Sequence, residues 1–296
     1  MPWRLGCAGA VPDNRNAHSL VRLDGGEFTM GNDGGPDYPG DGEGPARRVT
    51  VDAFSIDRYA VTNGQFATFV DATGHVTDAE RFGWSFVFAG LLPDDFVETR
   101  GVVGAEWWRQ VFGAQWRHPE GPQSDLADRL DHPVLHVSWD DAQAYCAWVG
   151  LRLPTEAEWE FAARGGLEGK RYPWGDEVLV DGRHQCNVWQ GTFPNVNTVE
   201  DGYYGTAPVD TFAPNGYGLY NVVGNAWEWC HDWFDAEFHR DGPRRNPTGP
   251  PHGTQRVMRG GSFLCHESYC FRFRVPARSS NSPDSTTGNL SFRCAG

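Results

Sequence analysis

Tryptophan, glycine and proline constrain the fold of this chain more than any other feature. The 296 residues include 13 Trp, 37 Gly and 20 Pro. Glycine and proline interrupt helices and strands, whereas large aromatic side chains supply apolar area for burial. The combination predicts a loop-rich fold whose long connections are held in place by buried indoles.

Three segments carry the signatures of helices. The first begins at Thr62 or Asn63 and stops before Gly74. A Ser-x-x-Asp capping box opens residues 138–150, and a Thr-x-x-Glu box opens residues 155–165. Each segment has apolar residues at helical spacing and a closing glycine, so three helices are expected.

The rest of the chain indicates short strands and loops. Residues 19–31 and 47–62 alternate in polarity and predict short strands joined by glycine-rich turns. Residues 81–131 contain several tryptophans but weak periodicity, and we expect long surface loops there. Almost no helix is expected after residue 165. The pattern predicts an α+β fold with much irregular structure.

No linker or internal repeat divides the chain into two units. Residues 1–18 are expected to be a loose lead-in, and residues 19–296 a single domain. A hydrophobic content of 39% is enough for a packed core.

Charge and hydropathy exclude some classes of partner. The net charge of −14 argues against nucleic-acid binding, which requires a basic surface. No stretch of eighteen or more apolar residues exists, so no membrane-spanning helix is expected. The N-terminal residues lack the apolar core of a signal peptide, and a cytoplasmic location is therefore expected.

Cys265 and Cys270 form the most informative chemical feature. Two thiols so close in sequence can form a small disulfide, bind a soft metal, or alternate between the two states. Nearby positive charge favours the thiolate. The basic residues of this segment are Arg259, His266, Arg272, Arg274 and Arg278. The alternative is a strand with two buried, inert cysteines.

Four blocks of the chain resemble one family. Residues 152–166, 172–177, 213–229 and 259–274 are similar, in order, to the formylglycine-generating enzymes of the sulfatase-modifying-factor family, in their bacterial aerobic form. The block S-x-x-C-H-x-S-Y-C at residues 262–270 is the part specific to formylglycine generation. The resemblance implies the formylglycine-generating-enzyme fold, which is C-type-lectin-like.

The resemblance also implies an activity. The family oxidises the cysteine of a C-x-P-x-R motif in an unfolded sulfatase polypeptide to formylglycine, which activates the sulfatase, using O2 and a thiol reductant. Cu(I) would be held by Cys265 and Cys270, in agreement with its preference for thiolate ligands. Zinc is a weaker alternative because no second close cysteine pair accompanies the first. A dithiol redox site is also weaker, since C-x-x-C spacing is absent.

The resemblance assigns roles to other side chains. Ser262, Trp227, His266 and Asn289 match catalytic or pocket-lining positions of the family, although structural support of the loop is an alternative role for each. Two structural Ca2+ sites are implied as well. The first comprises Asn187, Val188, Asp201 and Tyr203; the second comprises Asn221, Val222, Gly224 and Ala226. Mixed side-chain and carbonyl oxygens suit Ca2+, and Asx-turns without an ion are the alternative.

The remaining cysteines help to predict the cellular compartment of the protein, because disulfides are rare in the cytoplasm. The resemblance implies a disulfide between Cys146 and Cys294, whereas a second family disulfide is missing because its positions hold Ala163 and Val275. This loss agrees with a cytoplasmic protein, where disulfides are rare. No partner is expected for Cys7, Cys186 and Cys230.

Two other functions are compatible with the same fold. The first is a non-catalytic module that binds peptide or protein, which retention of both Cys265 and Cys270 disfavours. The second is an iron-dependent sulfoxide synthase, which the absence of an H-x-x-x-H-x-E triad disfavours. A monomer is the simplest expectation for an enzyme that acts on unfolded chains.

Overall fold

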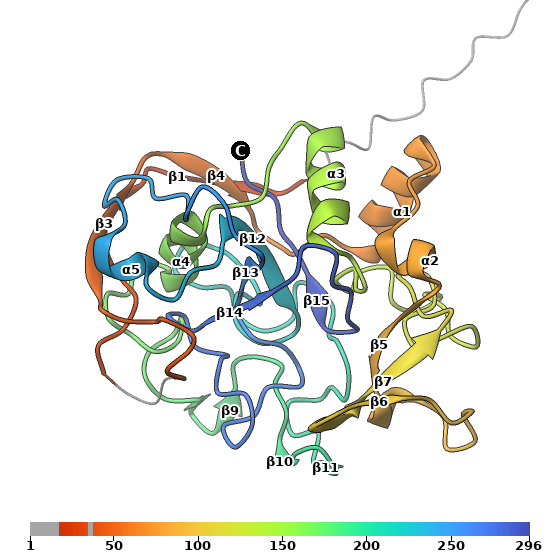
Figure 1. The fold of residues 1–296 in the computed structure, drawn as a ribbon. Helices are drawn as coiled ribbons and strands as arrows, with labels where there is room; N and C mark the ends of the chain where they lie inside the picture. The colour runs from red at the N-terminus through yellow and green to blue at the C-terminus, as the bar shows by residue number, and fades with distance from the viewer. Residues whose placement is uncertain (1–17, 35–37) are drawn as a thin grey trace, which may run out of the picture.

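The structure is a computed structural model that describes residues 18–34 and 38–296. At its centre lies a four-stranded sheet in the order β14-β13-β12-β15 (Figure 1). These strands are β12 (Trp227–Trp233), β13 (Arg256–Arg259), β14 (Arg278–Asn281) and β15 (Leu290–Ser291). Only the β12–β15 pair within this sheet is parallel. The described residues form one α+β domain, as predicted; most of the expected lead-in, and Cys7 with it, lies outside them.

Small antiparallel sheets surround the central one. Strand β1 pairs with β4, β2 with β3, β8 with β9, and β10 with β11, while β5, β7 and β6 form a three-stranded sheet. Their bounds are β1 (Leu20–Leu23), β2 (Gly26–Met30), β3 (Arg47–Val51), β4 (Phe54–Asp57), β5 (Trp84–Phe88), β6 (Gly101–Val102), β7 (Ala105–Phe112), β8 (Leu179–Val180), β9 (Arg183–His184), β10 (Gly191–Thr192) and β11 (Val196–Asn197). The first four confirm the strands expected near the N-terminus.

The three predicted helices are present with their predicted ends. They are α1 (Asn63–Thr73), α3 (Trp139–Val149) and α4 (Glu156–Arg164). Each opens with a complete capping box and closes at a glycine in the left-handed region. Short turns of helix complete the set: α2 (Asp78–Phe82), η2 (Ala89–Leu91) and α5 (Phe238–Asp241).

The expectation of long loops across residues 81–131 was wrong in part. Strands β5 and β7 pair over five residues each, from Trp84 opposite Phe112 to Phe88 opposite Trp108. Most of the β7 side chains are only partly buried, so they lack a clear two-residue alternation of burial. The position of β7 could therefore not be predicted from an alternation of polar and apolar residues.

The tryptophans pack as the composition predicted. Six of the twelve in the described residues are buried and the other six are half-buried. Two buried indole N–H groups donate to carbonyl oxygens distant in the chain, Trp139 to Cys230 at 2.9 Å and Trp229 to Val137 at 3.1 Å. The indoles thus fix loops to the core by both packing and hydrogen bonding.

A buried ion-pair network joins α4 to the central sheet. Glu156 Oε1 lies 2.7 Å from Arg259 Nη1 and 2.6 Å from Arg278 Nε, and Glu160 Oε2 lies 2.6 Å from Arg259 Nη2. All four side chains are at most 3% exposed. Burial opposes ionisation of Glu156, but the charges of Arg278 and Arg259 outweigh it and hold its pKa well below the usual range.

Among the described residues, no helix is long and apolar enough to cross a membrane.

Replacing Glu156 by Gln tests the network. The substitution leaves Arg259 and Arg278 buried with an unbalanced charge, so the free energy of unfolding in urea is expected to fall by about 3–5 kcal/mol. Arg48→Ala is the control, because Arg48 and Glu27 form a pair that is more than half exposed; it is expected to cost less than about 1 kcal/mol. Equal losses for the two variants would contradict the importance of the network.

Candidate active site

A glycine turn after β13 starts the loop that carries both thiols. Gly261 has φ of +75°, and a Cβ there would lie 2.9 Å from the Cα of Phe273. Only glycine fits this turn without displacing backbone. The next turns are closed by Cys265 N–H donating to the Ser262 carbonyl at 2.9 Å and Cys270 N–H donating to the His266 carbonyl at 2.7 Å. These turns bring the two cysteines together.

The thiols of Cys265 and Cys270 are buried and close enough to influence each other's ionisation. Interaction with the Cys265 thiol, with a smaller contribution from the positive charge of Arg272, lowers the pKa of Cys270. Burial and the neighbouring Cys270 raise the pKa of Cys265 well above its usual value. Cys270 is therefore the more acidic thiol of the pair.

Three of the five basic residues expected to favour the thiolates are paired with buried carboxylates. Arg259 and Arg278 bind Glu156, as described above, and Arg274 binds Glu43 at 2.7 Å. Their charges are thus balanced by buried carboxylates. Arg272 is an arginine whose positive charge does lower the pKa of Cys270.

Residues 38–43 form a clamp over the second half of the thiol loop. The Tyr38 hydroxyl accepts from the Phe271 N–H at 2.9 Å and donates to the Tyr269 carbonyl at 3.3 Å. The Asp41 carboxylate accepts from Arg272 Nε at 2.5 Å, and the Arg272 guanidinium stacks 3.8 Å from the centre of the Tyr38 ring. No local pattern in the sequence predicts this clamp, because its partners are about 230 residues apart.

The two thiols line a cavity of about 190 Å³. Its wall combines aromatic, hydroxyl and amide side chains with one arginine. The lining residues are Trp108, Trp227, Met258, Ser262, Leu264, Cys265, Tyr269, Cys270, Arg272, Ser279, Asn281, Thr287 and Asn289. Trp108, Ser279, Asn281 and Thr287 were missed from the sequence because β7, β14 and the turn before β15 bring them in from distant segments.

Three of the four accessory residues singled out from the sequence lie on this wall. The Asn289 amide donates to the Ser262 hydroxyl at 3.0 Å and accepts from the Thr287 hydroxyl at 2.8 Å. Trp227 lies beside them, because its backbone N–H donates a hydrogen bond to the Asn289 backbone carbonyl at 2.9 Å. His266 does not line the cavity: its ring is half-buried and hydrogen-bonds to the Ser268 hydroxyl at 2.8 Å.

The residues of the first predicted calcium site meet in one loop cluster. Asp201 accepts hydrogen bonds from the backbone N–H groups of Val188 at 3.1 Å and Tyr203 at 2.9 Å. Burial raises the pKa of Asp201. The Asn187 amide nitrogen donates to the Gly205 carbonyl at 2.8 Å, whereas its side-chain oxygen is buried without a hydrogen-bond partner.

The second predicted calcium site shows the same feature. Asn221 has φ of +48°, and its amide nitrogen donates to the carbonyls of Pro208 and Val209 at 3.2 and 3.1 Å. Its side-chain oxygen is also buried without a partner. The following residues of this predicted site, Val222, Gly224 and Ala226, form the turn that leads into β12. An unpaired buried oxygen at each site is the arrangement that a bound cation would satisfy.

The disulfide implied for Cys146 and Cys294 is not formed in the structure. Both residues are thiols, with their Sγ atoms 3.4 Å apart. Cys186 and Cys230 are also buried thiols, and burial raises the pKa of each. Neither Cys186 nor Cys230 lines the cavity of the thiol pair.

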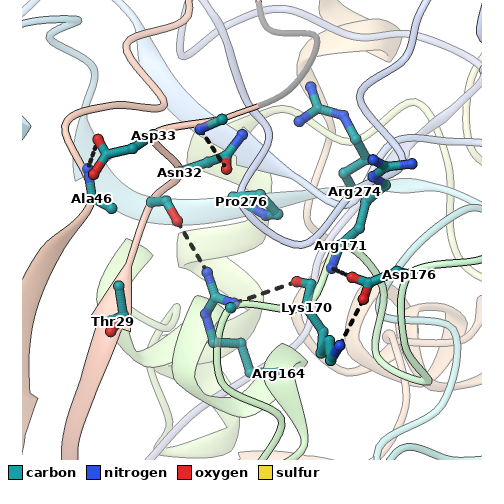
Figure 2. Close-up of a pocket in the computed structure, with 13 residues that line it drawn as sticks. Thr29, Asn32, Asp33, Ala46, Arg164, Lys170, Arg171, Asp176, Arg274 and Pro276 are labelled. Carbon is teal, nitrogen blue, oxygen red and sulfur yellow. Dashed lines mark hydrogen bonds and ion pairs between the residues drawn. The ribbon is translucent and has the colours of Figure 1, made fainter.

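A second cavity, of about 260 Å³, is lined largely by charged and polar groups (Figure 2). Lys170 binds Asp176 at 2.6 Å, and Arg164 donates to the Gly31 carbonyl at 3.2 Å. Arg274 shares this wall but is engaged by Glu43. The lining of this cavity includes no thiol. The thiol-lined cavity is therefore the candidate active site.

Comparison with known proteins shows the family of this chain. The family model for the sulfatase-modifying factor enzyme 1-like domain matches residues 8–296. The chain belongs to the formylglycine-generating enzyme family. The formylglycine-generating enzyme of Thermomonospora curvata is 60% identical over 283 residues, which cover 94% of this chain and 93% of that protein.

Other relatives show the breadth of the family. A Mus musculus protein named inactive C-alpha-formylglycine-generating enzyme 2 is 45% identical over 297 residues, covering 99% of this chain and 90% of its own. Among solved structures, PvdO from Pseudomonas aeruginosa superposes with a TM-score of 0.67 at 25% identity, covering 93% of each chain. The fold is therefore that of the family, and activity must be argued from the site residues.

Replacing Tyr38 by Phe tests the clamp. Loss of the hydroxyl removes both hydrogen bonds to the thiol loop, so peptides covering residues 269–274 should exchange amide hydrogen roughly fivefold faster, which corresponds to about 1 kcal/mol. Tyr59→Phe is the matched control, since Tyr59 packs on Tyr220. Unchanged exchange at residues 269–274 in the Tyr38 variant, measured by mass spectrometry, would show that the clamp does not hold the loop.

Proposed function

We propose that this protein converts the cysteine of a C-x-P-x-R motif in sulfatase polypeptides to formylglycine, using O2 and a thiol reductant. The observation that carries the proposal is the pair of buried cysteines, Cys265 and Cys270, on the wall of one cavity. The relatives named formylglycine-generating enzyme support the same reaction. Two neighbouring cysteines in a cavity favour an enzyme over a non-catalytic protein that only binds peptide.

The reaction balances with these co-substrates. One substrate cysteine, one O2 and two reductant thiols give one aldehyde, one hydrogen sulfide, one reductant disulfide and one water. The substrate side chain loses two electrons and the reductant thiols lose two more, and O2 accepts all four. The aldehyde oxygen enters when a thioaldehyde of the substrate is hydrolysed. The enzyme itself is unchanged at the end of the cycle.

Cys265 and Cys270 are the residues that would hold Cu(I). Two adjacent thiolates in a buried site match the preference of this soft ion for sulfur. When bound, Cu(I) would supply a site where the substrate thiolate and O2 meet. The chemistry of the donor set thus fits copper. Asp41 binds the Arg272 guanidinium, whose positive charge lies near Cys270.

The other wall residues prepare the cavity for substrate. Ser262 presents a hydroxyl whose orientation is fixed by Asn289, and Asn289 is fixed in turn by Thr287. This chain of hydrogen bonds can position a polar group of the substrate or O2. Trp227, Trp108 and Tyr269 exclude water from the sulfur atoms by their bulk. His266, outside the wall, supports the turn that brings Cys270 back to Cys265.

We further propose that Ca2+ binds at the two predicted loop sites. The unpaired oxygens of Asn187 and Asn221 and the buried carboxylate of Asp201 would each gain a cation partner. Calcium would stabilise the loops that lead into β12 and so hold Trp227 in the cavity wall. Its role is structural, because neither asparagine lines the thiol cavity.

The test is a mass-spectrometric assay on a peptide with the C-x-P-x-R motif. Protein, O2 and a thiol reductant are supplied with and without Cu(I). We expect an aldehyde-bearing peptide whose rate of formation rises with copper. Cys270→Ser should lower the rate by at least the roughly 10–100-fold typical of disturbed metal sites. Cys230→Ala, which changes a buried cysteine outside the cavity, should retain activity.

Two outcomes would contradict the proposal. Peptide binding without conversion under every condition would show a binding module and not an enzyme. Conversion that is indifferent to copper, to chelators and to Cys270→Ser would leave the reaction but remove the thiol pair from it.

A further inference from the structure

A second group of metal-binding side chains lies outside the candidate active site. His18, Asp57 and Cys294 each offer one ligand atom, and these atoms all lie within 4.8 Å of one another. Cys146 adds a second sulfur 3.4 Å from the Cys294 sulfur. The side chains of His18 and Asp57 are only 7% and 5% exposed, and both cysteines are at most 1% exposed. None of the four lines the thiol cavity.

Three separate parts of the fold bring these side chains together. The Asp57 N–H donates to the Cys294 carbonyl at 2.8 Å, so the end of β4 and the C-terminal segment are adjacent. Leu20 on β1 pairs with Asp57, which places His18 just before the paired strand. Cys146 comes from α3, which lies near the chain's C-terminus (Figure 1). The cluster therefore joins the first described residues, a helix and the last residues of the chain.

From this cluster, we propose that His18, Asp57, Cys294 and Cys146 form a structural Zn2+ site. Zinc takes four nitrogen, oxygen and sulfur ligands in a tetrahedron, with bonds of about 2.0–2.3 Å. Such bonds require ligand atoms roughly 3.3–3.8 Å apart. The two sulfurs are 3.4 Å apart, within this range, whereas His18 Nδ1 and Asp57 Oδ2 are 2.5 Å apart and would have to separate. Cys146 is not in the group whose ligand atoms lie within 4.8 Å of one another, so its side chain would have to move toward His18 and Asp57 as the fourth ligand.

The surroundings of His18 match a metal-binding histidine. Its Nε2 lies 3.1 Å from the Tyr145 hydroxyl, while its Nδ1 faces Asp57. A histidine that binds metal through one ring nitrogen usually donates a hydrogen bond through the other, which fixes the ring. Zinc would also balance the buried Asp57 carboxylate and the cysteine thiolates, whose burial without a cation is costly.

The zinc site and a Cys146–Cys294 disulfide exclude each other. Forming the disulfide removes two electrons and two protons from the thiols and needs an oxidant, after which neither sulfur is available to a metal. The two states make different predictions for single variants. A disulfide depends equally on both cysteines, whereas the zinc site depends more on Cys294, which belongs to the cluster with His18 and Asp57.

The experiment uses the full chain with Cys265→Ala and Cys270→Ala, so that the active-site thiols cannot bind the metal. The protein is reduced with a phosphine, equilibrated with Zn2+ and dialysed, and zinc per chain is measured by plasma mass spectrometry. One zinc per chain is expected. Co2+ in place of zinc should give sulfur-to-cobalt charge-transfer absorption and the intense visible bands of a tetrahedral site.

Matched variants in this background locate the ligands. Cys294→Ala should abolish zinc retention and the cobalt charge-transfer band. Cys146→Ala, which removes the same side-chain volume, and His18→Ala should weaken affinity by roughly 10–100-fold. His132→Ala is the control, since His132 hydrogen-bonds to Thr206 and belongs to no such cluster among the described residues. Circular dichroism shows that each variant is folded.

The proposal is overturned if reduced protein, with both thiols shown to be free by alkylation, retains no zinc and gives no cobalt–sulfur band. It is also overturned if Cys294→Ala retains the metal. A protein isolated with the disulfide is reduced before the measurement, so the same two outcomes decide the question. The result is independent of oxidase activity, because the active-site cysteines are absent.

Discussion

One buried carboxylate closes the loop on which the candidate site is built. Glu156 Oε1 binds Arg259 at the start of the loop and Arg278 at its end, at 2.7 and 2.6 Å. The same two arginines face each other in the β13–β14 pair. Both ends of the segment from Arg259 to Arg278 are therefore anchored to the same residue of α4, Glu156. A loop this long, with little regular structure, would otherwise lose much of its order to chain entropy.

Because the loop is closed, the thiols of Cys265 and Cys270 are held in fixed positions although the loop has little regular structure. The clamp of Tyr38 and Asp41 holds its second half, and Glu43 holds Arg274. With those charges engaged elsewhere, the thiol pair faces a cavity of aromatic and neutral polar groups, and among the described residues that line it only Arg272 is basic. The unpaired oxygens of Asn187 and Asn221, in contrast, lie in loops where the described residues supply them no donor. These oxygens are where the proposed Ca2+ ions would bind.

The elements predicted correctly from the sequence are those fixed by neighbours in the chain. The three long helices have their capping residues and closing glycines within a few positions, so their ends could be predicted. The cysteine pair was found for the same reason. The partners of the arginines were not, because Glu156 and Glu43 lie from about 100 to 230 residues away. Strand β7 was missed because its half-buried side chains lack a two-residue pattern.

The central claim is that Cys265 and Cys270 together form a copper-binding redox centre. X-ray absorption at the copper edge tests it most directly, on Cu(I)-loaded protein that carries Cys146→Ala and Cys294→Ala so that this second cysteine pair cannot contribute. The account predicts one copper per chain with two sulfur neighbours, and loss of that signal when Cys265 and Cys270 are also replaced by alanine. Copper bound only through nitrogen and oxygen, or a sulfur signal that survives the replacement, would contradict it.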